Sequence, residues 1–219
     1  MVRRLAAIGS DASSPRLTMD EPSGPDLSSE VVDRLLEDRI VLLGRPIEDA
    51  VASLITAQLL HLEAQDPERD ITLHINSSGG PIAATLSIYD TMQHVRPDVS
   101  TICVGQATSG AAVLLAAGTS GKRFALPHAR IILRRPQEEI RGDAASIDVH
   151  ANELLRQRRL VDEILARHAG QPPEKVAADT ERDLFLSADE AKEYGVVDEV
   201  LKDRLRDAPG SPRDGTGRW

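Results

Sequence analysis

Two short glycine-containing turns hold the residues of this sequence that are best suited to chemistry. Residues 76–80 read NSSGG and residues 105–110 read GQATSG, and each turn follows a run of mainly apolar residues. Ser109 is the last residue but one of the second turn, and only Gly110 separates it from a run rich in alanine and leucine. A serine at such a strand-to-helix turn can act as a nucleophile if a base accepts its proton and an acid orients that base.

Other residues could complete such a site. Asp183, within the stretch ERDLF, could supply the orienting acid. The amides of Gly79 and Gly110 could point at one oxygen atom as an oxyanion hole, where one donor stabilises the transition state by about 3–4 kcal/mol. Simpler interpretations stay open, because a Gly-Gly pair often marks a plain turn and a serine often caps a helix.

The composition narrows the class of protein. A chain of 219 residues can bury one sizeable core, and its net charge of −9 argues against a nucleic-acid partner. No apolar run reaches the roughly 18 residues of a membrane span. The single cysteine, Cys103, fits a reducing compartment, so we expect a cytoplasmic protein. The histidines lack the spacing of metal ligands, and no metal site is expected.

The elements that must position these residues alternate along the chain. Apolar runs predict strands over residues 40–43, 71–75, 99–104, 124–126 and 130–133. Helical spacing predicts helices over about 47–62, 81–95, 111–117 and 143–169, and a capping box at Ser187 begins a helix that Gly195 ends. This alternation indicates an α/β fold with largely parallel strands. Residues 28–206 would form one domain between disordered segments at 1–27, which could also be processed, and 207–219.

Across residues 29–201 the sequence resembles the proteolytic subunit of the Clp protease, a self-compartmentalised serine peptidase. The matching stretches follow in order along most of the chain: DRI (38–40), INSSGG (75–80), IYDTM (88–92), residues 105–115, AAGT (116–119), KRFALP (122–127), ARI (129–131) and residues 187–195. The resemblance implies a crotonase-like superhelix of ββα units with a protruding long handle helix.

The resemblance also implies an assembly and a reaction. Such subunits stack as two rings of seven and receive unfolded polypeptides from a hexameric AAA+ ATPase, which is the component that uses ATP. No cofactor is therefore expected on this chain, nor a nucleic-acid or membrane partner. A Ser–His–Asp triad would fall on Ser109, position 134 and Asp183, and the long helix, with Glu181 and Arg182, would make contacts between the rings.

Position 134 departs from the family pattern. Relatives read RIMIHQP where residues 130–136 read RIILRRP, so Arg134 stands in place of the triad histidine. A guanidinium carries only donors and a pKa above about 12, and it cannot accept the serine proton. Losing the base can cost about 10⁶ in kcat. His128, six residues earlier, would lie about 20 Å away along an extended strand, too far to substitute.

Smaller departures affect substrate and partner binding. Ser78 replaces a usual proline, and His74 stands where a tyrosine is common in the pocket that docks the ATPase. The glycine-rich strand that holds substrate in relatives is largely lost over residues 137–140.

We therefore expect a degenerate site in a subunit with a structural or regulatory role, in a mixed barrel with an intact paralogue. Arg134 is expected to form a bidentate ion pair with Asp183, and the alternative is that it points into the aqueous chamber. Two other functions stay open. One is an active serine endopeptidase that takes its base from elsewhere, and the other is a crotonase-type enzyme that acts on acyl-thioesters.

Overall fold

The computed structural model describes residues 29–135 and 144–201. The terminal segments expected to be disordered, 1–27 and 207–219, and the altered stretch 137–140 lie outside these residues.

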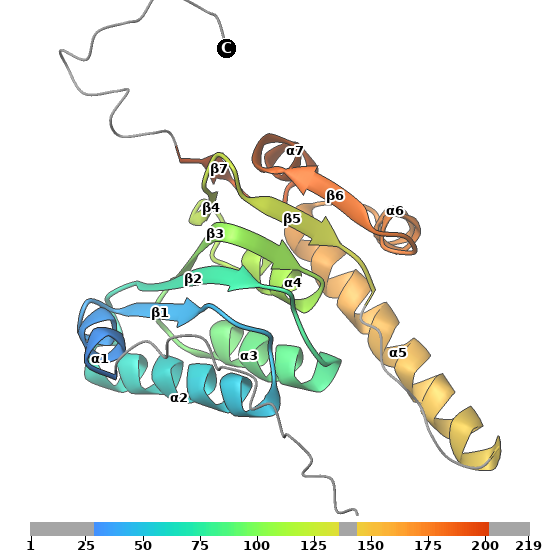
Figure 1. Ribbon diagram of the computed structural model, residues 1–219, viewed down its shortest axis with the longest axis horizontal. Coiled ribbons are helices and arrows are strands. Elements are labelled where there is room, and N and C mark those ends of the chain that lie inside the picture. Colours follow the sequence, from blue (N-terminus) through green and yellow to red (C-terminus); the bar gives the residue numbers. More distant parts are fainter. Residues whose placement is uncertain (1–28, 136–143, 202–219) are drawn as a thin grey trace, which may run out of the picture.

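A mixed sheet forms the centre of the described chain (Figure 1). Its order is β1-β2-β3-β4-β7, and β5 pairs with β3 on one edge and with β6 on the other. Every pair is parallel except β5–β6, which is antiparallel. The strands are β1 (Ile40–Leu43), β2 (Ile71–Ser77), β3 (Val99–Thr108), β4 (Arg123–Ala125), β5 (Arg130–Leu133), β6 (Leu184–Ser187) and β7 (Glu199–Val200).

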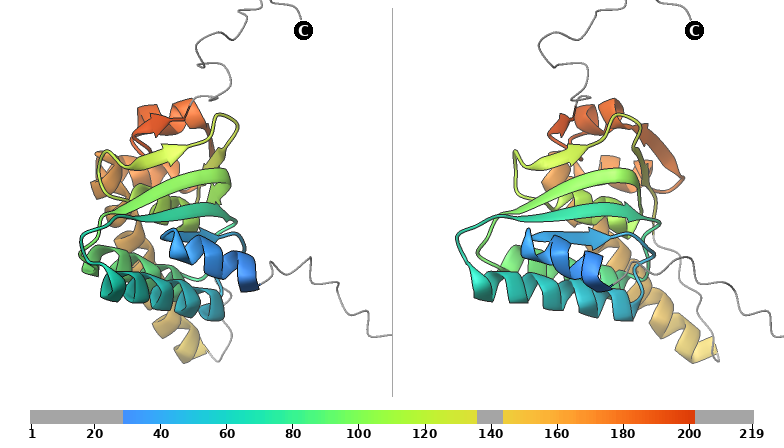
Figure 2. Two further views of the ribbon diagram at one scale, coloured as in Figure 1. Left: turned by 90° about the vertical axis from the view of Figure 1, so that its left-hand side faces the viewer. Right: turned by 60° about the vertical axis from the view of Figure 1, so that its left-hand side comes forward.

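The helices cover the sheet and extend beyond it. Helices α2 and α3 lie along the same side of β1 and β2, as both views of Figure 2 show. Helix α5 runs away from the sheet, and its N-terminal end lies far from the rest of the domain (Figure 1). The helices are α1 (Ser29–Glu37), α2 (Asp49–Gln65), α3 (Ile82–His94), α4 (Gly110–Ala116), α5 (Ala144–Ala169), α6 (Pro173–Asp179) and α7 (Ala188–Tyr194).

Aliphatic side chains from the strands and helices make the core. Strand β2 alternates buried and more exposed residues, so that Ile71, Leu73 and Ile75 are fully buried. They belong to one cluster with Ile55 and Leu59 of α2. Every residue of α4 is buried, which explains why that helix consists of small and aliphatic residues. The core therefore fixes the ends of β2 and β3, where the two glycine turns begin.

The predicted elements are confirmed, with small shifts in their bounds. β2 and β3 are longer than predicted, and Pro81 lies one residue before the first helical position of α3. The capping box at Ser187 is present, and Gly195 ends α7 with φ 95°. Helices α1 and α6 and strands β6 and β7 were not predicted. β7 has only two residues, and β6 pairs only with distant β5, so neither leaves a strong local pattern.

Arg39 ties the end of α2 to the start of β2. It is 4% exposed, and its guanidinium donates to the carbonyl oxygens of Leu62, Asp66, Arg69 and Asp70 over 2.9–3.0 Å. Arg39→Ala should lower the free energy of unfolding by about 3–4 kcal/mol, because buried carbonyls would lose charged donors. Chemical denaturation measures this change. Arg34→Ala, at an exposed position of α1, is the control, and a loss in Arg39→Ala no larger than in that control would contradict the prediction.

Candidate active site

Ser109 lies in a strained turn between β3 and α4. Its backbone has φ 54° and ψ −120°, a conformation that costs a residue other than glycine about 1–3 kcal/mol. Its N–H donates to Ile132 O on β5 over 2.9 Å, which holds the turn against the neighbouring strand. Its side chain makes no capping hydrogen bond to α4, so the simpler interpretation as a helix cap is not supported. A strained serine between strand and helix is the geometry of a nucleophile elbow.

The turn at residues 76–80 lies directly against Ser109. A Cβ on Gly79 would stand 2.4 Å from Thr108 O, 3.1 Å from Gly110 N and 3.2 Å from Ser109 Cβ. Gly79 also has φ 81°, so both its conformation and its surroundings require glycine. The structure thus brings together the two turns that the sequence singled out.

The two amides expected to form an oxyanion hole differ in their present partners. The N–H of Gly79 donates to Ser77 Oγ over 3.1 Å. The N–H of Gly110 belongs to the first turn of α4, where a helix provides no internal acceptor. Gly79 could act as a donor to substrate only if Ser77 released its amide, whereas Gly110 needs no such change.

Arg134 and Asp183 face each other across the β5–β6 pair. The pairing of Leu133 with Leu184 places these two positions at the same end of the two strands. Arg134 Nη1 lies 3.8 Å from Asp183 Oδ2, and the two side chains are 41% and 45% exposed. The expected ion pair is present, but the expected bidentate geometry is wrong. Their closest approach is longer than a hydrogen bond, and both side chains are exposed to solvent.

No imidazole takes the place of a base beside Ser109. All six histidines lie within the described ranges, and none of them has a hydrogen bond to the Ser109 hydroxyl. His168 Nε2 bonds to Tyr89 OH over 3.1 Å, and His150 Nδ1 bonds to Ser146 O over 2.7 Å. The described part of the chain therefore supplies a serine and an acid but no base between them.

The Arg134–Asp183 contact should contribute little to stability. Because the contact is long and exposed, we expect the coupling energy of these two residues to be below about 0.5 kcal/mol. A double-mutant cycle with Arg134→Ala, Asp183→Ala and the double variant, followed by chemical denaturation, measures it. A coupling above about 1.5 kcal/mol would contradict this expectation and indicate a desolvated pair.

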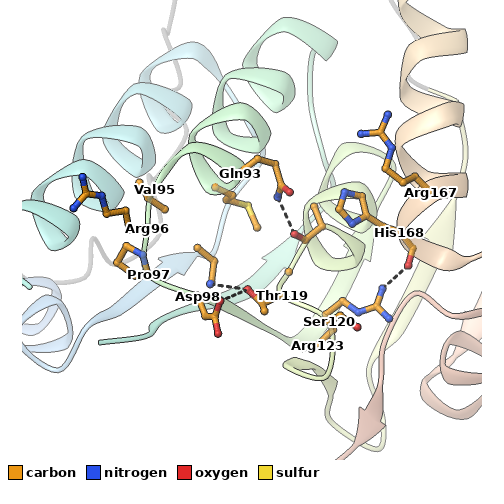
Figure 3. A pocket seen from close by; sticks show the side chains of 14 residues that line it. Gln93, Val95, Arg96, Pro97, Asp98, Thr119, Ser120, Arg123, Arg167 and His168 are labelled. Carbon is orange, nitrogen blue, oxygen red and sulfur yellow. Dashed lines mark hydrogen bonds between the residues drawn. The ribbon is translucent and has the colours of Figure 1, made fainter. Parts of the chain in front are cut away.

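The hollows described near these elements differ in whether they belong to the site. A hollow of about 290 Å³ is lined by residues that include Arg134, Asp183 and Thr180. A larger one of about 480 Å³ lies between the end of α3, residues 117–120 and the end of α5 (Figure 3). Its Gln93 side chain donates to Ala117 O and its Arg123 side chain to His168 O, so these polar groups serve the fold.

Several supporting residues were not recognised from the sequence as parts of the site. Asn76 Oδ1 accepts the N–H of Gln106 over 3.1 Å and joins the two turns. A Cβ on Gly110 would stand 2.3 Å from Thr85 Oγ1, so α3 packs directly under the serine turn. Asn76 belonged to a noted motif, but no local pattern identifies Thr85.

The described residues place some limits on other kinds of site. They contain no group of three or more His, Cys, Asp or Glu side chains that could hold a metal ion. None of the helices in the described ranges is long and apolar enough to cross a membrane.

Fold and site together define an α/β protein with the framework of a serine hydrolase. The model of the Clp protease family matches residues 23–204. The chain therefore belongs to the Clp protease family, and its α/β architecture agrees with the crotonase-like fold of that family. Members of the family are serine peptidases that assemble with other Clp subunits and work with an ATPase.

Proposed function

We propose that this chain is a Clp-type peptidase subunit whose own site does not cleave peptides. The observation that carries the proposal is Arg134, whose guanidinium faces the acid Asp183 from the position of the base. A guanidinium has no lone pair to accept the proton of Ser109. Without that transfer the hydroxyl stays a weak nucleophile.

The rest of the proposed site keeps its shape. Ser109 is 7% exposed and holds its strained backbone through the bond of its N–H to Ile132 O. Gly110 would be one oxyanion donor and Gly79 the second, once the bond of its N–H to Ser77 is released. A site that is folded but lacks a base supports a role in binding or assembly more than one in hydrolysis.

The proposed role is structural or regulatory. The chain would join intact paralogues in stacked rings of seven, in the cytoplasm, and a hexameric AAA+ unfoldase would feed unfolded polypeptides into the barrel. Helix α5 supports this assembly, because Ile147, Val149 and Leu155 expose apolar side chains on a helix that extends beyond the domain. Such side chains are usually covered by a partner.

Labelling with a fluorophosphonate probe tests the proposed inactivity. The purified chain should stay unlabelled under conditions that label an intact Clp subunit completely, and it should not cleave short peptides. The Ser109→Ala variant defines the background. Labelling of Ser109 at the rate of the intact subunit would contradict the proposal and favour an active peptidase with a base from elsewhere. Turnover of an acyl-thioester would favour a crotonase-type enzyme.

The mixed barrel has a separate test. Co-expression with an intact paralogue should give one particle that contains both chains, visible by size-exclusion chromatography and native mass spectrometry. Recovery of the two chains only in separate particles would contradict the mixed assembly, whatever the labelling shows.

A further inference from the structure

Asp162 of helix α5 lies where three segments of the chain meet. Thr180, which follows α6, has its Oγ1 3.0 Å from Asp162 Oδ1 and 2.8 Å from Val176 O, and its one hydroxyl proton can go to either acceptor. Arg135, which follows β5, brings its Nη2 to 3.5 Å from Asp162 Oδ2. One carboxylate therefore contacts both the segment that ends in Arg134 and Arg135 and the segment that leads to Asp183.

These two segments also contact each other directly. The N–H of Arg135 donates to Thr180 O over 3.2 Å, and Arg135 Nη2 donates to Ala177 O over 2.9 Å. Arg134 precedes Arg135, and Asp183 stands three residues after Thr180. Arg135 therefore joins the two segments beside the Arg134–Asp183 pair, and Asp162 contacts both Arg135 and Thr180 at this junction.

Asp162 and Thr180 are buried and Arg135 is partly buried, while Arg134 and Asp183 are exposed. The Asp162 side chain is 8% exposed, compared with 41% for Arg134 and 45% for Asp183. Burial raises the pKa of the Asp162 carboxyl, and the Thr180 hydrogen bond and the Arg135 charge oppose that rise. A buried carboxylate is costly unless its oxygens are satisfied, so its partners are held firmly. The exposed pair has no comparable restraint of its own.

We propose that Asp162 is a positioning residue of the candidate site, which holds positions 134 and 183 in register by binding Arg135 and Thr180 at once. It acts through these neighbours and need not touch a substrate. This inference deepens the proposed function and rests on it for the identity of the site. The quantity that it predicts, the local opening of two backbone segments, does not depend on whether the site cleaves.

The substitution Asp162→Asn changes the charge and the hydrogen bonds of this side chain but keeps its size, so it tests the polar contacts apart from packing. A carboxylate offers an acceptor oxygen to each of two donors, whereas an amide of the same size offers one oxygen and turns an NH₂ group toward the other donor. The Asp162→Asn side chain lacks the charge that attracts Arg135. It can only donate to the Thr180 hydroxyl oxygen, whose proton must then go to Val176 O. Thr180→Val removes the hydroxyl contact with Asp162 and leaves the Arg135 contact in place. Arg135→Gln shortens the side chain at position 135 and removes its charge.

Hydrogen–deuterium exchange of the full chain measures the effect. In Asp162→Asn, peptides that cover residues 130–135 and 177–184 should exchange about tenfold faster or more, while peptides from β1 and β2 keep their rates. The matched control is Glu153→Gln on the same helix, which breaks the exposed pair of Glu153 with Arg156 and should leave both segments unchanged. Unchanged rates in Asp162→Asn, or an equal increase throughout the domain, would overturn the proposal.

A second readout distinguishes this inference from the proposed function. In the Arg134→His background, adding Asp162→Asn should slow fluorophosphonate labelling of Ser109 about tenfold or more, whereas adding Glu153→Gln should not. Equal labelling with and without Asp162→Asn would overturn the positioning role. If Arg134→His alone gives no labelling, the missing-base account fails, and the exchange rates still decide the role of Asp162.

Discussion

Replacing Arg134 with histidine should raise fluorophosphonate labelling of Ser109 by at least about 10³-fold over the unmodified chain. An imidazole can accept the hydroxyl proton as the serine attacks, and Asp183 can hold the resulting cation. The pairing of Leu133 with Leu184 already sets positions 134 and 183 at the same end of two adjacent strands. We expect less than the full factor of about 10⁶ for a lost base, because the remainder of the site has not been shaped around an imidazole.

The control for this prediction removes the arginine charge without adding a base. Glutamine at position 134 is polar, shorter than arginine and uncharged, but its amide is not basic and cannot accept the serine proton. The Arg134→Gln variant should label no faster than the unmodified chain, and Arg134→His combined with Ser109→Ala should not label at all. Equal rates for Arg134→His and Arg134→Gln would show that the missing base is not the cause of inactivity. Peptide hydrolysis, alone and in mixtures with an intact relative, then extends the measurement to turnover.

Gly80→Ala should lower the free energy of unfolding by about 3 kcal/mol or more. A Cβ on Gly80 would stand 2.0 Å from Ile47 O and 2.8 Å from Ile47 C, both of them backbone atoms that cannot rotate away. The close approach arises because Ile47 N–H donates to Gly79 O over 2.9 Å. The added methyl group would therefore force apart the segment before α2 and the turn that lies against Ser109.

Gly44→Ala is the matched control for this clash. The nearest atom to a Cβ on Gly44 is a side-chain carbon of Leu42 at 3.5 Å, an ordinary contact. Its effect on chemical denaturation should stay below about 1 kcal/mol. If both variants lose the same stability, the close approach at Gly80 is not what requires glycine there. A shifted turn should also lower the labelling that Arg134→His restores.

Local patterns were sufficient for most of the fold. Short apolar runs and helical spacing predicted β1 to β5 and the helices α2 to α5, and the capping box predicted α7. Helix α1 was overlooked. Strand β6 was not predicted because its neighbour β5 lies more than fifty residues earlier in the chain. Its four residues are stabilised by that distant pairing more than by their own periodicity.

In the candidate site, too, the sequence determines some properties and the tertiary structure determines others. The residue type at position 134 determines by itself that no base stands there, since the acidity of a guanidinium changes little with its surroundings. Tertiary structure alone decided that Arg134 approaches Asp183 no closer than 3.8 Å, that the Gly79 amide donates to Ser77 Oγ, and that Asp162 contacts both Arg135 and Thr180. Whether an arginine side chain can accept a proton depends on its chemical type and can be read from the sequence. The distances between groups far apart in the chain are set by how strands and helices pack around the core.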